Sequence, residues 1–110
     1  MSEHARRAGM NEAIFREVNE QIQKLTERFD NEGERMTVVC ECADGACTMQ
    51  FEVPVELYER VRADARLFLV APGHEIPELE EVVHAQADYE IVRKREGTPA
   101  DVAEETDPRS

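Results

Sequence analysis

Residues 36–53 of this chain read MTVVCECADGACTMQFEV, and this segment predicts a β-hairpin. Apolar and polar residues alternate on both arms, which is typical of antiparallel strands with one face on a core and the other in water. Polar neighbours such as Glu41 are expected on the water side. The four residues 43–46 predict a tight turn, with Gly45 at positive φ. The residues expected on the core face are Met36, Val38, Cys40, Cys42, Cys47, Met49, Phe51 and Val53.

All three cysteines of the chain lie around this turn, in the pattern Cys-x-Cys-x4-Cys. Residues two apart on a strand point the same way, so Cys40 and Cys42 present their sulfur atoms to one side. The turn brings Cys47 back opposite Cys42, where cross-strand Cβ atoms lie about 5 Å apart. Three thiolates can therefore converge on one metal ion, and we predict a structural zinc site.

A closed zinc site needs a fourth ligand. The first candidate is His74, because the adjacent Gly73 allows a tight turn that brings the ring close to a metal. His84 is the second candidate, and Asp44 inside the hairpin loop is another. His4 is a poor one, since it belongs to the N-terminal lead-in.

An amphipathic helix is expected from Asn11, as its N-cap, to about residue 29 or 30. Residues 31–33 are expected to end it. Its apolar residues repeat at spacings of three and four, which predicts that one face packs on the hairpin. Alternatively, this stripe forms the seam of a homodimer. The stripe consists of Phe15, Val18, Ile22, Leu25 and Phe29, widened by Ile14.

The remaining segments complete a single α+β domain over residues 10–95, with the first helix packed on a small, mainly antiparallel sheet. Pro54 suits the first turn of a second helix over about residues 55–65. Residues 67–70, 81–85 and 89–94 are expected as strands, although residues 78–86 fit a helix equally well. Residues 1–9 and the acidic residues 96–110 are expected to be disordered.

The composition narrows the classes of function. Of 110 residues 35% are charged, and the net charge of -12 argues against binding to nucleic-acid phosphates. Only Arg60, Arg62 and Arg66 and the segment 93–95 offer a basic patch. No apolar run is long enough to span a membrane. Residues 1–9 lack the apolar stretch of a secretory signal, and three cysteines do not make a disulfide scaffold, so we expect a cytoplasmic protein.

Three segments together resemble a group of short uncharacterised bacterial proteins. They are Asn11-Glu12-Ala13 with Phe15 to Glu20, then Cys40 to Asp44, then Phe68 to Glu75, which contains Pro72-Gly73-His74. The resemblance spans about residues 11–95. It implies kinship of fold, and no activity is known for the group.

We therefore expect a noncatalytic zinc-binding module that acts in protein interaction or regulation through a protein partner. No phosphate-binding loop, metalloprotease motif or nucleophile elbow occurs in the chain. Several alternatives stay open: a thiol redox sensor that releases its metal on oxidation, a small metalloenzyme, an iron–sulfur site, and inert core thiols or a Cys42–Cys47 disulfide.

Overall fold

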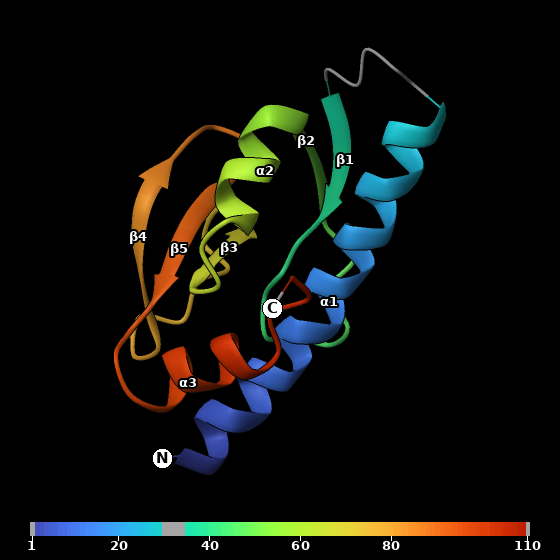
Figure 1. Cartoon of the computed structure of the whole chain (residues 1–110). Coiled ribbons are helices and arrows are strands. Elements are labelled where there is room, and N and C mark those ends of the chain that lie inside the picture. Colours follow the sequence, from blue (N-terminus) through green and yellow to red (C-terminus); the bar gives the residue numbers. More distant parts are fainter. Residues whose placement is uncertain (1, 30–34, 110) are drawn as a thin grey trace.

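The computed structural model describes residues 2–29 and 35–109. It confirms an α+β fold, in which helices and two small antiparallel sheets pack together (Figure 1). None of the helices in these ranges is both long enough and apolar enough to cross a bilayer. In chain order the elements are α1 (Ser2–Phe29), β1 (Arg35–Val39), β2 (Gln50–Pro54), α2 (Val55–Arg62), β3 (Leu67–Val70), β4 (Glu80–Ala85), β5 (Glu90–Lys94) and α3 (Thr98–Glu105).

The hairpin predicted from the alternating pattern is formed by β1 and β2. Met36 pairs with Val53 and Val38 with Phe51, and all four side chains are buried. The connection, residues 40–49, is wider than the predicted four-residue turn. It leaves Met49 half exposed instead of on the core face. The wider loop gives the cysteines room to turn toward one another.

The second sheet has the strand order β3-β5-β4, and all its pairs are antiparallel. This confirms the strands expected near residues 67–70, 81–85 and 89–94, and the alternative helix over residues 78–86 is wrong. A bulge between Val82 and His84 shifts the register of β4. Beyond the buried Glu80, every residue of β4 is exposed.

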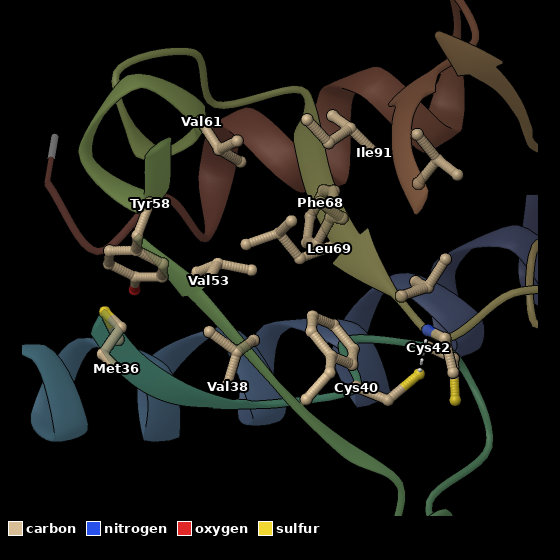
Figure 2. Packing of buried hydrophobic residues seen from close by; sticks show 14 of the residues in the cluster. Met36, Val38, Cys40, Cys42, Val53, Tyr58, Val61, Phe68, Leu69 and Ile91 are labelled. Atoms are coloured by element: carbon tan, nitrogen blue, oxygen red, sulfur yellow. Dashed lines mark hydrogen bonds between the residues drawn. The ribbon is translucent and has the colours of Figure 1, made fainter. Parts of the chain in front are cut away.

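One apolar core lies between the two sheets and α2. It contains Val38 and Val53 of the hairpin, Tyr58 and Val61 of α2, and Leu69 of β3. Figure 2 shows this cluster, with Met36 and Tyr58 at one end and Cys40 and Cys42 at the other. The two cysteines thus lie at the edge of a packed core.

Helix α1 lies beside β1, as predicted, but it turns its polar face inward (Figure 1). Ile22 contacts the core, whereas Ile14 is 62% exposed and Val18 and Leu25 also face outward. Polar side chains on the opposite face of α1 fix the rotation of the helix. Together with buried polar side chains of α2, β4, β5 and the segment that follows β1, they form a layer that we call the polar seam. It consists of Glu12, Arg16, Asn19, Glu41, Arg62, Glu80 and Lys94.

Two of these anchors show how α1 is held. Asn19 donates from Nδ2 to the Val39 carbonyl at 2.9 Å and accepts from the Val39 N–H at 2.8 Å. Arg16 donates to the carbonyls of Ala65 and Ala103. These bonds require both side chains to point inward, so the apolar stripe opposite them must point outward.

Both ends of the chain differ from the expected disorder. Residues 2–9 belong to α1, so Asn11 is not an N-cap; its Nδ2 donates to the Ala43 carbonyl at 2.8 Å. The acidic C-terminal segment forms α3, which packs on α1. At Gly9 a Cβ atom would lie only 2.6 Å from Cγ1 of the buried Val102. This close approach orders two segments whose composition predicted disorder. The expected helix end at residues 31–33 lies outside the described residues.

Candidate metal centre

The four residues predicted as zinc ligands come from three neighbouring pieces of chain. Cys40 and Cys42 directly follow β1, Cys47 lies in the loop before β2, and His74 follows β3. Their ligand atoms all lie within 4.8 Å of one another. We call these four residues the thiol cluster. They are positioned to hold a metal ion.

Two distances within the thiol cluster match those of a tetrahedral shell. Nδ1 of His74 lies 3.5 Å from Sγ of Cys40 and 3.6 Å from Sγ of Cys47. With zinc–sulfur bonds of about 2.3 Å and a zinc–nitrogen bond of about 2.0 Å at the tetrahedral angle, sulfur and nitrogen are about 3.5 Å apart. Nδ1 of His74 is therefore placed to bind an ion together with Cys40 and Cys47, and the remaining ligand atoms lie within 4.8 Å.

A tight turn delivers His74 to the sulfur atoms. The N–H of His74 donates to the Ala71 carbonyl at 3.0 Å, which closes a four-residue turn. Gly73 has a φ of 83°, a left-handed conformation that favours glycine, and Pro72 precedes it, as in a type II turn. The expectation that Gly73 allows this turn is confirmed. The same turn aims the Ala71 N–H at Sγ of Cys40, 3.1 Å away.

The loop around Asp44 is also closed by hydrogen bonds. Oδ1 of Asp44 accepts from the N–H of Ala46 at 2.9 Å, and its carbonyl accepts from Cys47 N–H at 3.0 Å. The Asp44 side chain therefore stabilises the turn and is not in the thiol cluster. The predicted positive φ at Gly45 is wrong, since among the described glycines only Gly73 and Gly97 adopt it.

The other two candidate histidines lie elsewhere. His84 is exposed on β4, with Nε2 2.9 Å from the amide nitrogen of Gln86 and its ring near Tyr89. His4 is exposed on α1. Of the histidines and the aspartate considered for the fourth position, the structure brings only His74 to the cysteines within the part of the chain it describes.

The cysteines are reduced and hidden to different degrees. All three are free, with Cys40 and Cys42 buried and Cys47 partly exposed. Burial raises the pKa of the Cys40 thiol, partly offset by the Ala71 N–H, and burial also raises the pKa of Cys42. Without a cation these thiols stay protonated at neutral pH, so a bound metal must displace their protons. A shallow depression lined by Cys42, Asp44, Gly73 and His74 leads from solvent to the cluster.

The residue between Cys40 and Cys42 also differs from the sequence-based expectation. Glu41, predicted to face water, is 0% exposed, and its carboxylate forms an ion pair of 2.8 Å with Arg62. Strand alternation correctly turned its side chain away from the two cysteines. The pattern held no sign that α1, α2 and β3 would cover that second face.

Comparisons of this chain with protein-family models, with curated proteins and with solved structures find no match. The resemblance to short bacterial proteins stays a prediction.

Proposed function

We propose that this protein is a noncatalytic zinc-binding module, in which a structural Zn²⁺ is held by Cys40, Cys42, Cys47 and His74. One observation carries the proposal: four electron-pair donors converge within 4.8 Å, and no cationic side chain is among them. Without an ion these side chains make weak sulfur contacts: Nδ1 of His74 lies 3.5 Å from Sγ of Cys40 and 3.6 Å from Sγ of Cys47, and Sγ of Cys42 lies 4.0 Å from the Asp44 carbonyl. A divalent cation would bind all four ligand atoms at once.

The donor set favours zinc. Three sulfur atoms and one imidazole form a common structural zinc shell. A single iron–sulfur cluster usually takes its cysteines at other spacings. Because four protein donors close the shell, no position is left for a water molecule, which argues against a metalloenzyme.

In this role the ion joins two pieces of chain that otherwise meet only through noncovalent contacts. Cys40, Cys42 and Cys47 belong to the hairpin connection, and His74 belongs to the turn that follows β3. The ion would fix the first sheet against the second. Reduced thiols suit the cytoplasm, the compartment that we propose.

Metal titration tests the proposal, with reduced protein purified under chelation. We expect one Zn²⁺ per chain and, with Co²⁺ in its place, the absorption of a tetrahedral site with three sulfur ligands. His74→Ala should lower the Zn²⁺ affinity at least tenfold. His84→Ala is the matched control, and it should bind as the unchanged protein does, since His84 lies outside the cluster.

Two results would contradict the zinc site. Reduced, folded protein that takes up no Zn²⁺ at micromolar concentration overturns the proposal. Equal losses of affinity in the two histidine variants would remove His74 from the shell.

A thiol redox sensor is a second candidate, and the partial exposure of Cys47 favours it. Hydrogen peroxide, with two protons from solvent, would convert the zinc-bound Cys42 and Cys47 thiolates to one disulfide and two waters and release the ion. Zinc release by stoichiometric peroxide, reversed by a thiol reductant, would support this role. Zinc retention under the same treatment would contradict it.

The outward face of α1 supports a protein partner, which we propose is either another protein or a second copy of this chain. Met10, Ile14, Val18 and Leu25 are exposed along it. Nucleic acid fits less well, because Arg62 is buried and Arg66 pairs with Glu96 and Glu104. A regulatory or interaction role would combine this surface with the zinc-stabilised fold.

A further inference from the structure

Glu41 stands between Cys40 and Cys42 and points away from them into the polar seam. Its carboxylate accepts four hydrogen bonds from three elements. Arg62 of α2 donates two, at 2.8 and 3.2 Å, Asn19 of α1 donates one at 2.6 Å, and the N–H of Leu69 in β3 donates one at 2.9 Å. A carboxylate held in this way has one position and one orientation.

The bond to Leu69 is reciprocal. The Glu41 N–H donates to the Leu69 carbonyl at 2.8 Å, while the Leu69 N–H donates to the Glu41 carboxylate at 2.9 Å. This pair of bonds attaches the Cys-x-Cys segment of the first sheet to β3 of the second. Two residues further along, the Ala71 N–H reaches Sγ of Cys40, and three more residues lead to His74.

We propose that Glu41 is the positioning residue of the metal centre: it holds the segment that carries Cys40 and Cys42 in register with the turn that carries His74 before any ion binds. The inference rests on the proposed zinc site. The inference adds that the site is preformed. The Glu41 carboxylate, which is not one of the four ligands, already attaches the segment of Cys40 and Cys42 to the strand that leads to His74.

The chemistry of the partners explains why a glutamate is needed. Every group facing the carboxylate is a donor: two nitrogens of Arg62, the amide nitrogen of Asn19 and a backbone N–H. Glutamine in its place would turn an NH₂ group toward at least one of these donors and would leave Arg62 without its counter-charge. The Cys-x-Cys segment would then lose its fixed distance from β3.

The test compares Glu41→Gln with Glu12→Gln. Glu12 is similarly buried, but its ion pair is with Lys94 of β5, a strand that carries none of the four ligands. Outer-shell substitutions typically cost about tenfold to hundredfold in metal affinity. We expect that loss of Zn²⁺ affinity for Glu41→Gln, with weaker and shifted Co²⁺ absorption, and neither change for Glu12→Gln.

Folded Glu41→Gln protein with unchanged Zn²⁺ affinity and Co²⁺ spectrum would overturn the proposal. If this variant does not fold, hydrogen exchange of the unmutated protein tests the positioning role of Glu41 instead. In the reduced, metal-free, unmutated protein, the amide hydrogens of Glu41 and Leu69 should exchange slowly. If they exchange at unfolded rates and become protected only when Zn²⁺ is added, the ion positions the segment and Glu41 does not.

The two proposals can fail separately. Absence of Zn²⁺ binding by the unmutated protein overturns the zinc site, whatever the exchange of these amides. Fast exchange without metal, together with normal Zn²⁺ binding, overturns only the positioning role.

Discussion

The thiol cluster, two of whose four residues are buried and two partly exposed, lies beside the buried polar seam, and Glu41 is the residue at which they meet. In the polar seam acidic and basic side chains face each other: Nζ of Lys94 lies 2.5 Å from Oε1 of Glu12 and 2.6 Å from Oε1 of Glu80, and Nη1 of Arg62 lies 2.8 Å from Oε2 of Glu41, although Nε of Arg16 has no hydrogen-bond partner among the described residues. In the thiol cluster all four side chains can donate electron pairs to a metal, and apart from the Ala71 N–H on Sγ of Cys40 the hydrogen bonds between and around them are long sulfur contacts of 3.5–4.0 Å.

This difference separates a structural role from a binding role. A buried polar group that has its hydrogen-bond partners within the chain is already satisfied. It fixes the packing of the helices and strands and does not need a ligand. The thiol cluster has mainly weak sulfur hydrogen bonds, and two of its four residues are partly exposed. Three sulfurs and an imidazole together suit a soft divalent cation, which is why the cluster, and not the buried carboxylates, is the candidate site.

Among the substitutions that test this difference between the thiol cluster and the polar seam, we expect the largest change in stability for Cys42→Ser. If the cluster binds zinc, the unmutated protein gains about 5 kcal/mol at a free Zn²⁺ concentration roughly 10⁴ times Kd, by mass action. The variant should lose this gain while its metal-free stability changes little. Urea unfolding with and without Zn²⁺ measures both quantities, and an equal response of the two proteins to Zn²⁺ would break the comparison.

Arg62→Met should show the opposite behaviour. It leaves the Glu41 carboxylate buried without a counter-charge and removes a partner of the Tyr58 hydroxyl. Removing one member of a buried pair costs about 3–5 kcal/mol. We expect this loss in urea unfolding whether or not Zn²⁺ is present, and a variant of unchanged metal-free stability would contradict the structural role of the seam.

Glu12→Gln should change the pH dependence of stability. Burial raises the pKa of Glu12 from 4.5 to about 7, although the positive charge of Lys94 acts to lower it. Between these values the folded protein keeps a proton that the unfolded chain has lost, so unfolding releases it and stability falls as pH rises. The fall amounts to about 3 kcal/mol.

The glutamine variant cannot titrate and should lack this part of the fall. Unfolding free energies measured between pH 4.5 and 8 for both proteins check the effect. Parallel curves for the two proteins would mean that Glu12 is ionised throughout.

The smallest effect on stability is expected outside both regions, on the apolar stripe of α1. Ile14→Gln alters a side chain that is 62% exposed, so unfolding should shift by less than about 0.5 kcal/mol. Any self-association through this face should weaken, which sedimentation across a range of concentrations would reveal. A large loss of stability would show that Ile14 is covered within the monomer.

Local patterns predicted much of this molecule correctly. Strand alternation in residues 36–42 gave the buried face of β1, and the Pro-Gly pair before His74 gave the turn that carries the ring. The Cys-x-Cys-x4-Cys spacing predicted that the three sulfur atoms converge, although they meet in the loop of residues 40–49 and not across a four-residue turn. These features depend on residues a few positions apart in the chain.

The rotation of α1 could not be predicted in the same way. Its apolar stripe indicated one buried face, yet Asn19 and Arg16 bind carbonyls of Val39, Ala65 and Ala103, which are far away in the chain. Likewise α3 formed from a segment that composition marked as disordered, because Gly9 allows Val102 to come close.

The sequence by itself determined the two hairpin strands, α2, β3 and β5, the three sulfurs of the thiol cluster and the candidates for its fourth ligand. Only the tertiary structure selected His74 over His84 and Asp44, buried Glu41 and turned the polar face of α1 inward. The physical reason is the separation along the chain. Backbone geometry fixes the direction of neighbouring side chains, whereas the partner of a buried charge or carbonyl comes from a residue that is distant in sequence.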